Sequence, residues 1–145
     1  MNFAFYNLAL TIAALLPAER MIPVCMETQS HGMTIRRAQA ITTQMFAAVG
    51  VRIEWHGLYG SCALVGDQAI LIELAEPGPH YTPGTLGNAL AFGEPRIHIF
   101  YERVRSAFAT EENFPFLLAH VLAHEIAHIL ERSDQHSGTG IMKAH

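Results

Sequence analysis

Basic side chains are scarce in this chain, and those present do not cluster. Lys and Arg together number 9 among 145 residues, against 13 Asp and Glu, which gives a formal net charge of -4. Proteins that bind nucleic acid usually gather Lys and Arg on one face or along one helix, because they must neutralise phosphates. The scattered distribution therefore excludes nucleic acid as an expected partner.

The chain also lacks an apolar run long enough for a comfortable transmembrane helix, which needs about 20 residues. Residues 1–18 carry no charged side chain and are rich in Phe, Leu, Ala and Ile. We interpret this segment as a signal peptide or as an N-terminal apolar segment that packs on the core. The first interpretation predicts a secreted or periplasmic protein and the second a cytoplasmic one, and neither predicts a stable membrane span.

Cysteine is limited to Cys25 and Cys62. Two cysteines in an exported chain usually pair, so export predicts a disulfide between them, whereas a cytosolic location predicts two free thiols. Half of the residues are apolar and no internal repeat is present, so residues 19–145 are expected to form a single domain with its own core.

The most informative stretch is His124-Glu125-Ile126-Ala127-His128, near the C-terminus. Residues four apart in a helix lie one turn above each other, so His124 and His128 can present two imidazole nitrogens to one metal ion. Glu125 lies about 100° round the helix, within reach of a water at the metal but poorly placed as a ligand. We therefore expect Glu125 to act as a general base.

A third protein ligand must come from the chain beyond this helix, because catalytic zinc usually has three protein ligands and one water. Asp134 and His136 are the two candidates. The expected cofactor is one catalytic Zn²⁺.

Together with Ser137 and Gly140-Ile141-Met142, these residues resemble the zinc motif of the metzincin metallopeptidases, with a matrixin-like ending. They also resemble small bacterial proteins of metallopeptidase type. The family pattern HExxHxxGxxH is not matched throughout, since Glu131 occupies the glycine position and Asp134 the third-ligand position. An aspartate there is similar to snapalysin-type metzincins, whereas the pair His136-Ser137 is similar to the matrixin pattern with a two-residue insertion.

These departures bear on the third ligand. We expect His136, because it begins the turn that leads to Met142 and because Glu131 lets the helix run further than a glycine would. Asp134 is the alternative ligand, or else a cap or a partner of a ligand. The resemblance also implies that Met142 lies beneath the metal in a Met-turn.

Apolar periodicity and turn residues predict most of the secondary structure. We expect Asn113 to cap the last helix, with Pro115 in its first turn, and the second strand to lie parallel to the first. The expected elements in chain order are strand 21–28, helix 34–49, strands 51–55, 68–75, 86–92 and 96–101, a short helix or turn at 102–110, and helix 114–131.

The expected class is α+β, and the resemblance implies a minimal metzincin catalytic domain. Such a domain has a twisted mixed sheet, a backing helix and a C-terminal active-site helix. The family binds an extended peptide along the edge strand, whose backbone groups are unpaired. The matching residues here are Leu86, Gly87, Asn88, Ala89 and Leu90.

The chain is therefore expected to be a zinc-dependent endopeptidase that hydrolyses peptide or protein substrates with a metal-activated water and Glu125 as general base. The alternatives are a zinc-binding interaction protein or pseudoenzyme on the same fold, and a zinc hydrolase of non-peptide substrates. The sequence carries no prediction of oligomeric state. His120 and the histidines outside the motif are expected to be ordinary core or surface residues.

Overall fold

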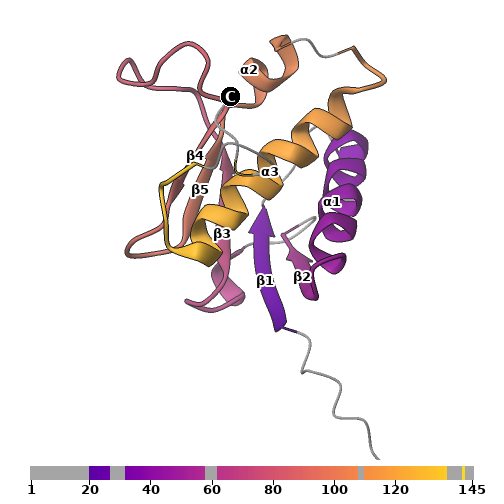
Figure 1. Ribbon diagram of the computed structural model, residues 1–145, viewed down its shortest axis with the longest axis vertical. Helices are drawn as coiled ribbons and strands as arrows, with labels where there is room; N and C mark the ends of the chain where they lie inside the picture. Colours follow the sequence, from indigo (N-terminus) through magenta and orange to yellow (C-terminus); the bar gives the residue numbers. More distant parts are fainter. Residues whose placement is uncertain (1–19, 27–31, 58–61, 108–109, 137–141, 143–145) are drawn as a thin grey trace, which may run out of the picture.

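The computed structural model of the chain describes residues 20–26, 32–57, 62–107, 110–136 and 142. They form an α+β fold with a mixed five-stranded sheet and three helices (Figure 1). Residues 1–18, the predicted signal peptide or apolar segment, lie outside the described residues. The elements in chain order are β1 (Arg20–Met26), α1 (Gly32–Ala47), β2 (Val51–His56), the 3-10 turn η1 (Cys62–Leu64), β3 (Ile70–Leu74), β4 (Gly87–Leu90), β5 (Arg96–Ile99), α2 (Tyr101–Ser106) and α3 (Phe114–Glu131).

The sheet has the strand order β2-β1-β3-β5-β4. β1 and β2 are parallel, with Arg20 opposite Val51, which confirms the predicted strand–helix–strand unit at the start of the domain. β3 and β5 continue the parallel sheet, and β4 closes it as an antiparallel edge strand. The predicted edge strand 86–92 is thus confirmed in position, although its paired part is the shorter segment Gly87–Leu90.

The core lies between one face of the sheet and the helices α1 and α3, which pack side by side across that face (Figure 1). Alternate residues of the strands point into it, because successive side chains of a strand face opposite sides. The strand residues buried in this core are Ile22, Val24, Met26, Ile53, Ile70, Ile72, Ile97 and Ile99. Among the described residues, no helix combines the length and apolar character needed to cross a membrane.

Helix α3 is buried along most of its circumference, which follows from its sequence. It has no glycine, and its only proline lies in the first turn, where the missing N–H has no helical partner in any case. Leu118, Leu122 and Ile126, spaced four apart, are fully buried in the core. The polar residues of the motif lie on a neighbouring face, so the packing of the apolar face sets the direction in which they point.

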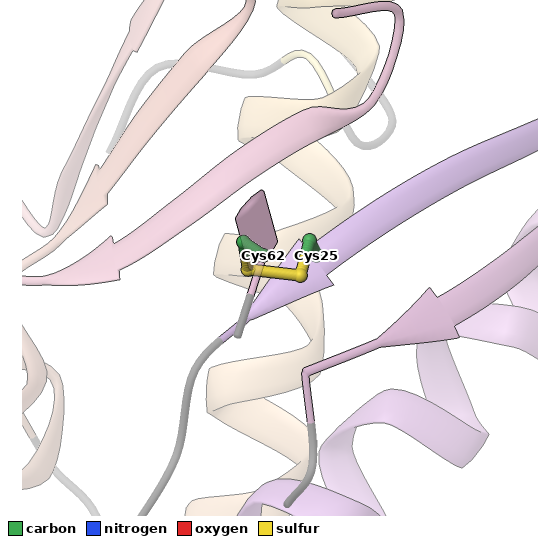
Figure 2. The surroundings of a disulfide bond; sticks show 2 residues. All are labelled: Cys25 and Cys62. Atoms are coloured by element: carbon green, nitrogen blue, oxygen red, sulfur yellow. A yellow bond between two sulfur atoms is a disulfide. The ribbon is translucent and has the colours of Figure 1, made fainter. Parts of the chain in front are cut away.

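The opposite face of the sheet is partly covered by the segment that contains η1. The predicted disulfide is confirmed: Cys25, at the end of β1, is bonded to Cys62 of η1, with their Cα atoms 5.7 Å apart (Figure 2). A Cβ at Gly57 would lie 2.9 Å from the carbonyl oxygen of Met26, and its φ is +89°. The chain therefore needs glycine there to leave β2 close to the end of β1.

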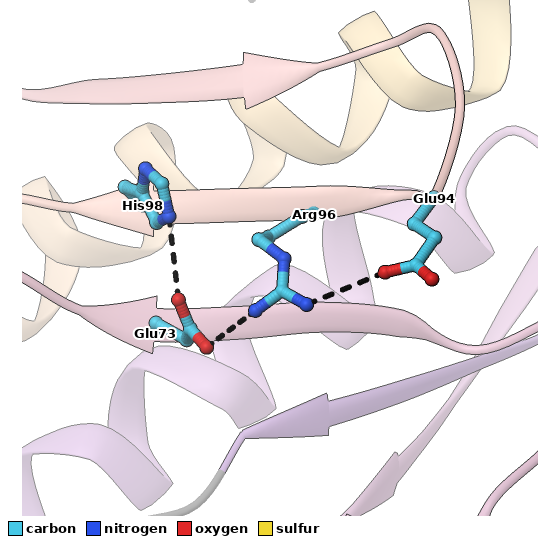
Figure 3. Close-up of polar contacts among 4 residues, drawn as sticks. All are labelled: Glu73, Glu94, Arg96 and His98. Atoms are coloured by element: carbon cyan, nitrogen blue, oxygen red, sulfur yellow. Dashed lines mark hydrogen bonds and ion pairs between the residues drawn. The ribbon is translucent and has the colours of Figure 1, made fainter.

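Charged side chains line the uncovered part of that face. Arg96 of β5 donates to Glu73 of β3 at 2.6 Å and lies 3.5 Å from Glu94, while His98 lies 3.3 Å from Glu73 (Figure 3). Glu73 and Glu94 are half exposed or more, and such pairs stabilise a protein by only about 0.2–1 kcal/mol. This group is a solvated surface network rather than the basis of the fold.

Candidate metal centre

The HExxH motif lies in the last two turns of α3, which spans the predicted residues Phe114–Glu131. Pro115 lies in the first turn, as predicted. Asn113 occupies the N-cap position, but the prediction that its side chain caps the helix is wrong. Its Oδ1 instead accepts a hydrogen bond from the backbone N–H of Thr110, in the turn before the helix, at 2.6 Å.

Three histidines converge at the C-terminal end of α3. The metal-binding nitrogens of His124, His128 and His136 all lie within 4.8 Å of one another. The Nε2 atoms of His124 and His128 are 3.0 Å apart. Two nitrogens bound tetrahedrally at the usual zinc distance of ~2.0–2.1 Å would be separated by about 3.3 Å. The three residues are therefore close enough together to hold one metal ion.

The protonation of His128 suits metal binding. Its Nδ1 lies 2.6 Å from the backbone carbonyl of Ser133, and a carbonyl can only accept, so Nδ1 carries the hydrogen. In the neutral ring Nε2 then has a free lone pair, and it faces Nε2 of His124. Histidines that bind metals usually donate their other ring N–H to a carbonyl or carboxylate in this way. Three imidazoles are a donor set that fits zinc among the common divalent ions.

The end of α3 explains how the chain reaches this arrangement. The helix runs to Glu131, as predicted, and Arg132 adopts a left-handed conformation with φ 49°. Ser133 N–H donates to the carbonyl of His128 at 3.2 Å, and Arg132 N–H to that of Ile129 at 3.3 Å. These are the two hydrogen bonds of a Schellman motif. Ser133 is thereby bonded to both the backbone and the ring of His128.

The two candidates for the third ligand are placed differently. His136 belongs to the group of three, and its ring stacks on that of His124, with centroids 5.2 Å apart. Asp134 lines the same cavity, but its carboxylate is not among the converging ligand atoms. His124 and His128 are buried, whereas His136 is exposed at the mouth of the site. The geometry favours His136 as the third ligand.

Glu125 lies beside the histidines in a cavity of about 260 Å³. Its side chain is only 6% exposed, and its carboxylate accepts a hydrogen bond from the backbone N–H of Ala89. Burial raises the pKa of Glu125 from 4.5 to about 7, and the Ala89 bond opposes part of that rise. A carboxyl group with a pKa near 7 can both accept and release a proton at neutral pH, which is what a general base and acid must do.

Strand β4 forms one wall of this cavity, so the structure brings the predicted edge residues next to the motif. Phe100 N–H donates to the Leu86 carbonyl at 2.9 Å, and Gly87 is opposite Ile99. Leu86 and Phe100 are thus a hydrogen-bonded pair, and such pairs alternate with non-hydrogen-bonded pairs along an antiparallel ladder. Gly87 and Ala89 belong to the non-hydrogen-bonded pairs, so their backbone groups point away from β5. The Ala89 N–H donates to Glu125, and the other groups are those that an additional strand would meet.

Met142 is buried, with 8% of its surface exposed. Ser137, Gly140 and Ile141, which complete the predicted ending, lie outside the described residues. The position of Met142 beneath the metal therefore stays a prediction.

Two contacts of the site were not foreseen from the sequence. The sequence predicts Gly87 and Ala89 as residues that meet a substrate and carries no prediction of their contact with Glu125. A glycine inside a predicted strand was the available signal, since it often marks a close approach of other groups to the backbone. The hydrogen bond from the His128 ring to Ser133 uses a backbone carbonyl, so no pattern of side chains in the sequence predicts it.

No family model, curated protein or solved structure matches the chain.

Proposed function

We propose that the protein is a zinc-dependent peptidase of metzincin type. Its metal ligands would be His124, His128 and His136, and its general base Glu125. The observation that carries the proposal is the combination of three converging histidines with a buried carboxyl group beside them, all facing one cavity. Three polar residues of α3, His124, Glu125 and His128, are buried together, and the desolvation of such groups costs free energy that a purely structural helix would avoid with apolar residues.

When bound, zinc supplies a Lewis acid and lowers the pKa of a water molecule towards ~7. The chain's own residues would do the rest. The Ser133 carbonyl holds the His128 ring so that its lone pair faces the site. Glu125 would accept a proton from the attacking water and return it to the departing amine, a transfer for which its raised pKa is suited. This is hydrolysis without a covalent intermediate.

The proposed substrate is an extended peptide. The backbone groups of Gly87 and the carbonyl of Ala89 point away from β5, at the edge that borders the cavity, and are not bonded to Glu125 as the Ala89 N–H is. A peptide that adds a strand there would run past the histidines and Glu125, and its backbone would supply most of the binding. The small cavity would hold only part of the peptide, with the remainder lying along β4.

We also propose that the protein works in an oxidising compartment, outside the cell or in the periplasm. The Cys25–Cys62 disulfide supports this location, because such bonds persist mainly in secreted and periplasmic proteins.

Metal analysis combined with a peptide-cleavage profile tests the proposed function. The purified protein should contain one zinc per chain, cleave members of a broad peptide library, lose cleavage when a chelator removes the metal, and regain it with added zinc. His124→Ala should lose zinc and cleavage together. Stoichiometric zinc without cleavage of any peptide would instead support a zinc-binding interaction protein or pseudoenzyme. Cleavage of esters or other small substrates alone would indicate a non-peptide hydrolase.

A further inference from the structure

Residue 87 is glycine for a steric reason rather than a conformational one. Its φ does not lie in the left-handed region that favours glycine, so its backbone would accept other residues. A Cβ added there, however, would lie 2.9 Å from Oε1, 3.0 Å from Cγ and 3.1 Å from Cδ of Glu125. Carbon atoms that are not bonded attract best at about 3.5–4.0 Å, so these three distances are too short.

Glu125 cannot easily give way to such a methyl group. Three successive atoms of its side chain would be met, so moving the carboxylate alone would not relieve the overlap. The side chain is buried on a helix whose neighbouring residues are buried as well, so the space open to it is the cavity that it lines, and a rotation into that cavity would move the carboxylate. Any rotation away from β4 would also break the hydrogen bond that the carboxylate accepts from Ala89 N–H.

Strand β4 therefore has two effects on one side chain. At Gly87 it leaves the space in which the Glu125 side chain lies, and at Ala89 it provides the donor that fixes the carboxylate. The two residues are on the same edge of the strand, since both lie at positions whose backbone groups point away from β5.

We propose that Gly87 is a positioning residue for Glu125. Because residue 87 has no side chain, the Glu125 carboxylate can lie where it would deprotonate the attacking water. This proposal rests on the proposed function, because it takes Glu125 as the general base. A misplacement of about 1 Å near the reacting atoms can cost on the order of 10²-fold in rate. The identity of residue 87 would thus control turnover without touching the metal.

The first test compares Gly87→Ala with Gly32→Ala in the zinc-loaded full chain. Gly32, the first residue of α1, does not line the cavity, and a Cβ added there would meet no atom within 4 Å. We expect Gly87→Ala to lower kcat on the order of 10²-fold, with zinc content unchanged and KM little altered. Gly32→Ala should cleave like the unchanged protein. Equal kcat values for Gly87→Ala and the unchanged protein would overturn the proposal.

A double-mutant cycle shows whether Gly87 acts through Glu125. In a Glu125→Gln background, Gly87→Ala should cause no further loss of kcat, because the base is already absent. A full additional loss would mean that residue 87 acts through the sheet edge instead, and would overturn the positioning role.

A stability cycle does not depend on activity. Gly87→Ala should lower the denaturation midpoint of the metal-free protein, and should lower it much less in a Glu125→Ala background, where Cγ, Cδ and Oε1 are gone. Equal shifts in the two backgrounds would refute the contact. If the cycle shows the coupling but the unchanged protein cleaves no peptide, the proposed function fails while the contact stands.

Discussion

Replacing Glu125 with glutamine separates its two effects, one on turnover and one on stability. Glutamine has nearly the same shape, so it fits against Gly87, and its side-chain oxygen can still accept the hydrogen bond from Ala89 N–H. It cannot accept a proton as a carboxylate does. The ligand group of His124, His128 and His136 does not include Glu125, so zinc content should stay at one per chain.

The expected loss of turnover follows from the role of a general base. Such catalysis contributes about 10²- to 10⁴-fold, which corresponds to roughly 3–5 kcal/mol of transition-state stabilisation. The assay is the cleavage rate of the best library peptide by Glu125→Gln and by the unchanged protein, at equal zinc content. Undiminished cleavage with full metal would refute the assignment of Glu125 as the base.

Glu125→Gln should lower turnover but raise the stability of the metal-free protein at neutral pH and above. Burial raises the pKa of Glu125 from 4.5 to about 7, so the folded protein holds the proton more tightly than the unfolded chain does. The free energy of unfolding should therefore fall as the pH rises through this interval, by up to about 3 kcal/mol, and stay lower above it. Glutamine does not titrate, so the Glu125→Gln protein should not show this fall in the free energy of unfolding.

The metal-free Glu125→Gln protein should consequently be more stable than the metal-free unchanged protein above pH 7, with the difference shrinking towards pH 4.5. Denaturant unfolding of both proteins at several pH values measures that difference. Zinc should reduce it, because a nearby cation favours the charged carboxylate. A difference that does not change with pH would show that the carboxyl group is not buried as the structure describes.

Three further predictions test other parts of the structure. His136→Ala should weaken zinc binding in a chelator competition far more than Asp134→Ala, and the reverse order would make Asp134 the third ligand. Replacing Cys25 and Cys62 together with alanine should lower the free energy of denaturant unfolding by about 4 kcal/mol, from their separation of 37 residues, and no loss would contradict a stabilising bridge. Ile126→Ala, at a fully buried position of α3, should lower the same quantity by about 2–5 kcal/mol. A cost below 1 kcal/mol would mean that the core is looser at α3 than its burial indicates.

Regular apolar patterns allowed most of the fold to be predicted. The helical spacing of the apolar residues in α1 predicts which face of that helix is buried. β1 alternates poorly, since Val24, Cys25 and Met26 are all buried, and its apolar composition predicts it instead. Element ends were less predictable. The paired part of β4 stops at Leu90, and Asn113 bonds to Thr110 rather than to the helix. Such local choices of hydrogen-bond partner leave no periodic pattern in the sequence, so they are hard to predict.

Only the residues of the site that lie close together in the sequence could be predicted. His124, Glu125 and His128 lie on one helix, so their spacing alone indicates a shared metal and a nearby base. The surroundings of Glu125 come from β4, a strand distant in the sequence. Neither the steric role of Gly87 nor the bond from Ala89 N–H can be derived without knowing which strand lies against α3.

The end of α3 gives a physical reason for the unusual ligand spacing. Glu131 continues the helix, and the left-handed turn falls on Arg132, one residue beyond the position where the metzincin pattern has glycine. A left-handed residue other than glycine costs roughly 1–2 kcal/mol, and the two bonds between Ser133 and His128 offset that strain. The chain returns to the cavity later than the pattern requires, so His136 rather than residue 134 joins the other histidines. A sequence pattern that requires glycine at position 131 and histidine at position 134 would therefore miss this group of three converging histidines.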